Sequence, residues 1–149
     1  LVLATGNKSE MAVGYATLYG DMCGGFAPLK DISKTMVYQL AKYRNTLSNV
    51  IPERVITRPP SAELAPDQVD QDSLPSYDIL DDILMKFVEQ KQSVNEIIEN
   101  GHSSEDVIKI TSLILRNEYK RRQSAPGPKI SSNASGKERR YPMTSKFKP

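Results

Sequence analysis

The chain has 149 residues, 38% of them hydrophobic and 26% charged, which is the balance of a globular domain and not of a disordered chain. A single cysteine and a single histidine exclude an intrachain disulfide, a cysteine metal cluster and a multi-histidine site within it. No apolar run approaches the roughly 20 residues of a membrane-spanning helix, so we expect a cytoplasmic protein with no signal peptide and no membrane contact.

The net charge of +2 conceals an uneven distribution of charge along the chain. Residues 61–106 hold twelve acidic and two basic side chains, whereas residues 116–149 hold ten basic and two acidic ones. The basic end is therefore a candidate for binding anions, such as nucleotide phosphates, nucleic acid or the acidic middle of the same protein. Its last part, residues 124–149, is rich in Pro, Ser, Gly, Lys and Arg, and we expect an extended or poorly ordered tail.

The first third of the chain predicts a strand followed by helices. Leu1–Thr5 is short and apolar, as in a buried strand, and a Gly-Asn turn leads into a helix expected over Ser9–Tyr19. Strand, polar turn and helix make half of a βαβ unit, which favours an α/β fold. A glycine-rich loop follows, and Ser33 is predicted to cap a helix that reaches about Arg44.

The middle of the chain is acidic and rich in proline. Between Ile51 and Ser76 it carries five prolines, and proline lacks the N–H that regular elements need. Loops of this length in a compact domain are usually functional or disordered, so we predict a lid loop at residues 57–75. From Ser76 to about Gln90, apolar residues recur at helical spacing and predict a helix.

Two capping boxes predict the helices that follow. Ser93 with Glu96 opens a short helix, and Ser103 with Asp106 opens the last one. The last helix is expected to continue to about Arg122, with an apolar stripe along one face.

Two stretches carry candidate binding chemistry. The turn from Thr5 to Glu10 lies where a strand ends and a helix begins, the place where α/β folds bind phosphates. The alternative is ordinary capping, with Thr5 or Asn7 as the cap and Glu10 in the first turn. In "RNEYKRRQ", Arg116 and Lys120 share a helix face and are either a phosphate or carboxylate clamp or a basic helix end favoured by its dipole.

Several long stretches, in the same order, resemble glutamine-dependent NAD synthetases. They are "LVLATGNKSEMAVGYATLYGDMCGGFAPLKD", "PERVITRPPSAELAPDQVDQDSLPSYDILD", "NEYKRRQSAP" and "RRYPMTSKF". The resemblance implies an α/β, adenine-nucleotide hydrolase-like sheet of the N-type ATP pyrophosphatase class. Residues 1–123 would be only the C-terminal, helix-rich part of that synthetase domain, with residues 124–149 as a basic C-terminal tail.

The family reaction is the amidation of deamido-NAD to NAD. The resemblance implies that ATP adenylates the nicotinate carboxylate, with Mg²⁺ neutralising phosphate charge, and that ammonia then attacks the mixed anhydride. In this branch a nitrilase-like glutaminase domain releases the ammonia from glutamine. We therefore expect an upstream synthetase half, that N-terminal domain and a homo-oligomer as partners, and no nucleic acid.

The resemblance also assigns residues by position. Thr5 and Lys34 match ATP-contacting residues, and Ser61 stands where the ammonia-dependent branch has an ATP-contacting threonine. Glu10 matches a glutamate assigned to deamido-NAD in this branch and to magnesium in the ammonia-dependent branch. Lys120 matches a lysine that binds deamido-NAD.

Two departures favour the glutamine-dependent branch. Leu18 and Tyr119 stand where the ammonia-dependent branch has a ligand-binding lysine and a histidine. The family's S-G-G-x-D-S loop and the Glu-Lys-Cys glutaminase residues do not occur in this sequence. We therefore expect Leu1 to begin a late strand of a sheet that starts upstream, and the chain alone to be inactive.

Two other functions remain open at this point. One is a related enzyme of the same pyrophosphatase class that acts on another carboxylate or carbonyl. The other is a nucleic-acid-binding or scaffold protein that uses the basic end, for which the tail supplies few aromatic stacking partners.

Overall fold

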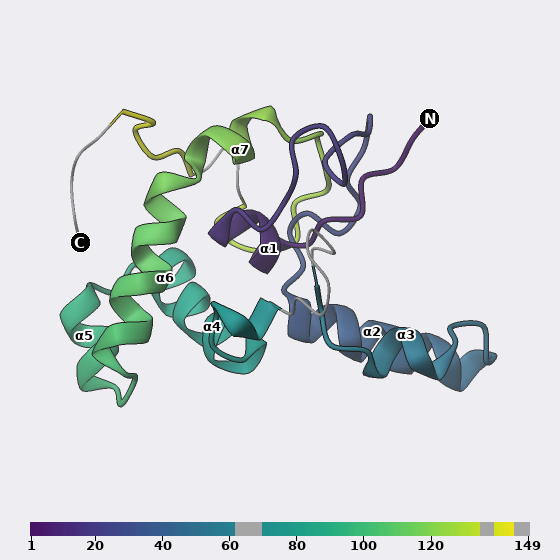
Figure 1. Ribbon diagram of the computed structural model, residues 1–149, viewed down its shortest axis with the longest axis horizontal. Helices are drawn as coiled ribbons and strands as arrows, with labels where there is room; N and C mark the ends of the chain where they lie inside the picture. The colour runs from purple at the N-terminus through teal and green to yellow at the C-terminus, as the bar shows by residue number, and fades with distance from the viewer. Residues whose placement is uncertain (62–69, 135–138, 145–149) are drawn as a thin grey trace.

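The computed structural model describes residues 1–61, 70–134 and 139–144, and this part of the chain is built from helices (Figure 1). In chain order the elements are α1 (Lys8–Val13), α2 (Lys34–Leu47), α3 (Glu53–Thr57), the 3-10 turn η1 (Asp70–Asp72), α4 (Tyr77–Leu84), the π-helical turn η2 (Met85–Glu89), α5 (Val94–Glu99), α6 (Ser104–Arg116) and α7 (Glu118–Gln123). Strands are absent from the described ranges, where an isolated parallel bridge joins Leu3 to Phe26.

The prediction of a buried strand at Leu1–Thr5 is wrong. The Ala4 N–H donates to the Phe26 carbonyl at 2.8 Å, as in a parallel pair, but Leu1 is 97% exposed and Leu3 54% exposed. Only the small side chains of the two segments are covered, with Ala4 and Ala27 packed against Ala125. The sheet of the expected α/β fold is thus not seen in the described residues beyond this contact.

The hydrophobic core lies where α4 and α6 meet α1, which sits at the centre of Figure 1. Ile83 of α4 and Ile110 and Ile114 of α6 are fully buried, as the apolar stripes of both helices predict. Ile97 of α5 closes the far end of this core. Helix α1 is therefore buried along most of its length, and Glu10 in its first turn is its one partly exposed residue.

One helix ends earlier than the sequence pattern predicts, and another is interrupted. The first stops at Val13 because Gly14 adopts a left-handed conformation with φ of 79°. The last is divided at Asn117 into α6 and α7. The Asn117 side chain donates to the Val13 carbonyl at 2.9 Å and to the Leu113 carbonyl at 2.8 Å. One amide thus joins the ends of α1 and α6, a long-range bond that periodicity does not reveal.

Of the two predicted capping boxes, only the first forms. The Ser93 N–H donates to Glu96 Oε2 at 2.7 Å, and the Glu96 N–H donates to Ser93 Oγ at 3.3 Å. Ser103 does precede α6, but its side chain makes no cap bond. Asp106 is one methylene shorter than the Glu or Gln of a capping box, which limits how far its carboxylate reaches back.

Helices α2 and α3 lie side by side and project from the rest of the molecule on the right of Figure 1. Ser33 caps α2 as predicted, by accepting the Met36 N–H. Helix α3 was not predicted, because Pro52 and Pro59 suggested continuous loop; its five residues fit between them. Residues 62–69, the middle part of the lid predicted at residues 57–75, lie outside the described residues.

The helix predicted from Ser76 to Gln90 begins and ends almost as expected, but its last turn is a π turn. The Gln90 N–H donates to the Met85 carbonyl at 3.0 Å, five residues back. This wider turn carries Glu89, which pairs with Lys8 of α1 and accepts the Asn133 N–H at 2.9 Å.

Part of the predicted tail is held against this network. The backbone N–H groups of Ile130 and Ser131 donate to Asp31 at 2.8 and 2.6 Å, and Lys8 pairs with Asp31 at 3.1 Å. Burial raises the pKa of Asp31, but the hydrogen bonds from Ser131, Ile130 and Lys8 outweigh it and leave that pKa below its ordinary value. Residues 130–133 are therefore part of the packed structure.

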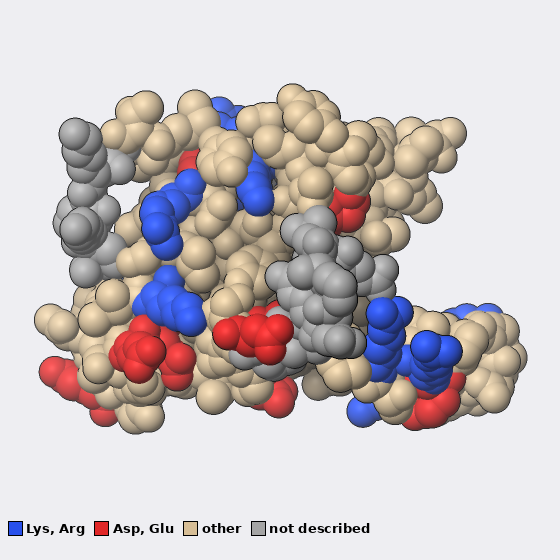
Figure 2. All heavy atoms as spheres, in the orientation of Figure 1, with Lys and Arg blue, Asp and Glu red and all other residues tan. Residues whose placement is uncertain are grey.

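Charge is distributed unevenly over the surface. Figure 2 shows basic side chains along the α2–α3 arm and acidic ones at the opposite end, where α5 and the start of α6 lie. Within the described ranges, the helices are too short or too polar to cross a bilayer.

Candidate functional site

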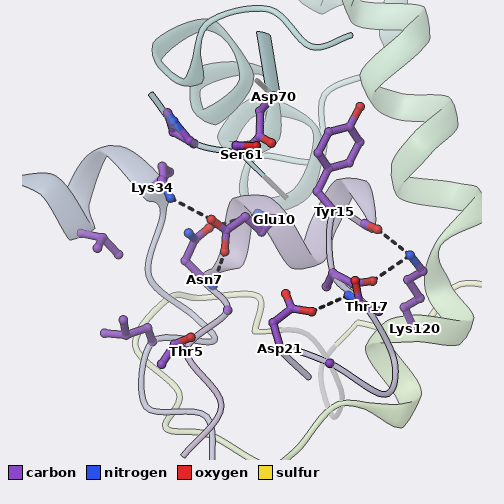
Figure 3. A pocket seen from close by; sticks show the side chains of 17 residues that line it. Thr5, Asn7, Glu10, Tyr15, Thr17, Asp21, Lys34, Ser61, Asp70 and Lys120 are labelled. Carbon is purple, nitrogen blue, oxygen red and sulfur yellow. Dashed lines mark hydrogen bonds and ion pairs between the residues drawn. The ribbon is translucent and has the colours of Figure 1, made fainter. Parts of the chain in front are cut away.

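A cavity of about 750 Å³ opens beside α1, and all five residues assigned by the resemblance line it (Figure 3). These residues come from distant parts of the chain: Thr5, Glu10, Lys34, Ser61 and Lys120. The fold thus brings together positions up to 115 residues apart in sequence, as the resemblance predicts. Their contact with ligands stays a prediction.

Glu10 is placed by the first turn of α1. Its Oε2 accepts the Asn7 N–H at 3.1 Å, and Asn7 Oδ1 accepts the Glu10 N–H at 3.0 Å, which completes a capping box. The capping alternative is therefore correct for Asn7. Glu10 Oε1 also pairs with Lys34 Nζ at 2.8 Å, across the base of the cavity.

Lys34 is the first residue of α2 and is held from several sides. Its N–H donates to Ser9 Oγ at 2.9 Å, which fixes the start of α2 against α1. Its ammonium lies 5.5 Å from the ring centre of Tyr77 and 5.6 Å from that of Tyr38, within cation–π range. With Glu10 as its ion-pair partner, this positive charge is confined to one edge of the cavity.

A buried carboxylate behind the cavity ties three helices together. Asp81 of α4 accepts the Thr35 N–H at 2.9 Å, the Thr35 hydroxyl at 2.7 Å and the Ser9 hydroxyl. Its negative charge lies at the N-terminal turn of α2, where the helix dipole favours it. Asp81 therefore sets the separation between α1 and α2, and with it the place of the Glu10–Lys34 pair.

Lys120 marks the opposite end of the cavity. Its Nζ donates to the carbonyls of Gly14 and Ala16 at 2.7 and 2.8 Å, so it braces the turn that follows α1 (Figure 3). An ammonium has three N–H donors, so these two bonds leave one for the cavity. Lys120 is thus more than a dipole-favoured helix end, because it bonds to a segment about 105 residues away.

Its neighbour Arg121 is buried, which the basic sequence pattern does not predict. Arg121 donates to the Ala12 carbonyl at 2.7 Å and pairs with Glu118 at 3.0 Å. Burial and the charge of Arg139 lower the pKa of Arg121 to about 10, against the opposing effect of Glu118, so Arg121 remains charged at neutral pH. Part of the basic cluster is therefore structural, which weakens the hypothesis of a nucleic-acid surface.

Thr5 and Ser61 lie on loops at the cavity wall, Thr5 before α1 and Ser61 just after the α2–α3 arm. Sequence reasoning missed two acidic lining residues, Asp21 and Asp70. Asp21 lies in the glycine-rich "GDMCGG" segment, which read as an ordinary turn. Asp70 lies in a stretch of similar acids with no periodic signal, and only the fold selects it from them.

The residues present fit a magnesium ion poorly. Glu10, the one lining carboxylate assigned to a metal, already holds Lys34 with one oxygen and the Asn7 N–H with the other. The described residues also contain no group of three or more potential metal ligands among His, Cys, Asp and Glu. Magnesium commonly binds through one or two carboxylates together with substrate phosphates, and the other two lining carboxylates, Asp21 and Asp70, also accept hydrogen bonds within the chain, from Thr17 and Tyr77.

Residues 1–124 match the family model described as NAD synthase. The chain is 66% identical to the glutamine-dependent NAD(+) synthetase of Acinetobacter baylyi, over 100% of this chain and 28% of that protein. The structure of a glutamine-dependent NAD(+) synthetase from Cytophaga hutchinsonii matches with a TM-score of 0.69 and 25% identity, over 97% of this chain and 24% of that one. The structure of NMN synthetase from Francisella tularensis matches with a TM-score of 0.61 and 26% identity, over 79% and 42%.

Proposed function

The chain belongs to the NAD synthase family, and from that premise we propose that it forms part of a longer, glutamine-dependent enzyme that amidates deamido-NAD to NAD. In this proposal ATP adenylates the nicotinate carboxylate and pyrophosphate leaves. Ammonia released from glutamine then attacks the acyl carbon, and AMP leaves. The chain spans 28% of the length of the relative from Acinetobacter baylyi, so the activity is proposed for the whole protein.

One observation carries the proposal: the five residues assigned by the resemblance all line one cavity. We assign Thr5, Lys34 and Ser61 to ATP. The Lys34 ammonium would attract phosphate charge, and two hydroxyls would donate hydrogen bonds to phosphate or ribose oxygens. The resemblance implies magnesium for the phosphates, but the three lining carboxylates, Glu10, Asp21 and Asp70, each already hold an ion pair or hydrogen bond within the chain.

We assign Glu10 and Lys120 to deamido-NAD. Lys120 holds a fixed positive charge at the far end of the cavity, with one N–H left to donate to an anionic ligand. Glu10 also orients the Lys34 ammonium, because its Oε1 lies 2.8 Å from Lys34 Nζ. The two cations lie at separate ends of the cavity (Figure 3), and we assign the Lys34 end to ATP and the Lys120 end to deamido-NAD.

The test is an assay of the full-length protein with ATP, Mg²⁺, deamido-NAD and either glutamine or ammonium. We expect NAD and AMP in equal amounts with both nitrogen sources, and none from the 149-residue chain alone. Because one structural relative is an NMN synthetase, the products should be separated to distinguish NAD from NMN. Absence of NAD from the full-length protein would refute the proposal.

A further inference from the structure

Tyr77, at the start of α4, lies behind the cavity wall and contacts two residues that line it. Its hydroxyl donates to Asp70 Oδ2 at 2.6 Å, and its ring lies 5.5 Å from the Lys34 ammonium. Tyr77 is 6% exposed and is not among the residues that line the cavity. Asp70 and Lys34 come from η1 and α2 and have opposite charges.

The hydroxyl of Tyr77 restrains a carboxylate that is costly to leave unpaired. Asp70 is 7% exposed, and its backbone N–H donates to the Pro60 carbonyl at 2.9 Å, beside Ser61. A buried carboxylate that loses a donor must find another or turn toward water. The water-accessible space next to Asp70 is the cavity, at the end where Lys34 and Ser61 lie (Figure 3).

Tyr77 itself is suited to donate and not to ionise. Burial and the hydrogen bond to Asp70 raise the pKa of the Tyr77 phenol well above its ordinary value. The O–H therefore remains a donor throughout the range in which an enzyme works. The ring meanwhile presents its face to Lys34, the favourable geometry for a cation.

We infer that Tyr77 is a positioning residue that holds the Asp70 carboxylate back at the wall of the nucleotide end of the cavity while it supports the Lys34 ammonium from behind. The inference rests on the proposed function for its assignment of this end to ATP. It assigns Tyr77 no contact with substrate. Without the hydroxyl, Asp70 turns into the cavity and places a negative charge where the phosphates of ATP would bind.

The test is Tyr77→Phe in the full-length protein, with ATP binding measured by titration and steady-state kinetics measured for both substrates. Phenylalanine keeps the ring that faces Lys34 and removes only the hydroxyl. We expect the Kd and KM for ATP to rise about tenfold, while the KM for deamido-NAD changes less than about twofold. Tyr38→Phe is the matched control, because Tyr38 also faces Lys34, and it should change the ATP affinity less than about twofold.

A double-mutant cycle with Asp70→Asn separates positioning from a general loss of structure. If the loss of ATP affinity comes from a released carboxylate, Tyr77→Phe should cost little in the Asp70→Asn background. An equal cost in both backgrounds, or an unchanged Kd for ATP in the single variant, overturns the inference. Wild-type protein that binds ATP but makes no NAD refutes the proposed function instead, and the ATP titrations still decide the role of Tyr77.

Discussion

Replacing Lys120 with methionine should weaken deamido-NAD binding and also loosen the turn after α1. Methionine keeps much of the alkyl chain and a high helix propensity, so α7 itself should persist. The change removes two charge-assisted hydrogen bonds, to Gly14 and Ala16. Such bonds contribute roughly 1.5–3 kcal/mol each, but cavity water can hydrate the two carbonyls, so we expect a net loss of about 2 kcal/mol in unfolding free energy.

Binding should fall for a separate reason, because Lys120 lines the cavity and its positive charge and its one remaining N–H donor are lost. We expect the Kd for deamido-NAD to rise about ten- to a hundredfold, equivalent to roughly 1.4–2.8 kcal/mol, with the Kd for ATP changing much less. Isothermal titration of the full-length variant with each nucleotide measures both values, and thermal unfolding measures the stability.

Asn117→Ala is the control that separates ligand binding by Lys120 from its structural role at the turn after α1. Asn117 donates to Val13 and Leu113 at 2.9 and 2.8 Å, so its loss loosens the same turn while Lys120 keeps its charge. Two neutral hydrogen bonds contribute about 1–2 kcal/mol together, close to the structural cost of the Lys120 variant. We expect Asn117→Ala to weaken deamido-NAD binding less than about threefold. Equal weakening by both variants would refute a direct contact and leave Lys120 a structural residue.

Three further variants test the cavity lining and the attachment of the tail. Glu10→Gln should lower NAD synthesis about tenfold or more, with at most about 1 kcal/mol of stability lost, since the amide still accepts the capping bond; near-normal turnover would remove Glu10 from the site. Gly14→Ala should cost more than about 2 kcal/mol in denaturant unfolding, because φ is 79° and the new Cβ would lie 2.1 Å from the Asn117 side chain; a neutral result would contradict the left-handed turn. Because the pKa of Asp31 is lowered below 3.8 on folding, its stabilising effect is complete above that pH and is lost as the pH falls through the folded value. Asp31→Asn should therefore reduce the decrease in unfolding free energy at acid pH and speed hydrogen exchange at the Ser131 amide. Unchanged exchange would show that Asp31 does not hold the tail.

Local rules predicted the parts of the fold that depend on neighbouring residues. The Ser33 cap and the Ser93–Glu96 capping box need only three or four consecutive positions, and both form. These rules failed where a residue far away in the sequence determines where a helix ends. Gly14 turns left-handed beside Asn117, more than 100 residues away, and that contact ends one helix and interrupts another.

The candidate site divides in the same way. Resemblance supplied the five residues that line the cavity, but no spacing or periodicity indicated that Lys120 braces the turn at Gly14 or that Arg121 is buried. A count of charges assigns Lys120 and Arg121 to a solvated basic helix end. It contains no information on which distant backbone carbonyls the fold brings within hydrogen-bonding distance of them. Sequence patterns did not reveal Tyr77 and Asp70 for the same reason, since the contacts of Tyr77 with Asp70 and with Lys34 link three elements that are separate in the chain.

The π turn at the end of α4 also determines where the chain can change in length. A π turn holds one residue more than an α turn, so deleting a residue between Met85 and Val88 can restore ordinary helix and leave Glu89 directed toward Lys8. A deletion within α4 itself has no such surplus, and it would rotate everything that follows by about 100° about the helix axis. Single-residue gaps among relatives should therefore occur in η2 and not in α4, wherever the hydrogen bonds from residues 130–133 to Asp31 and Glu89 are retained.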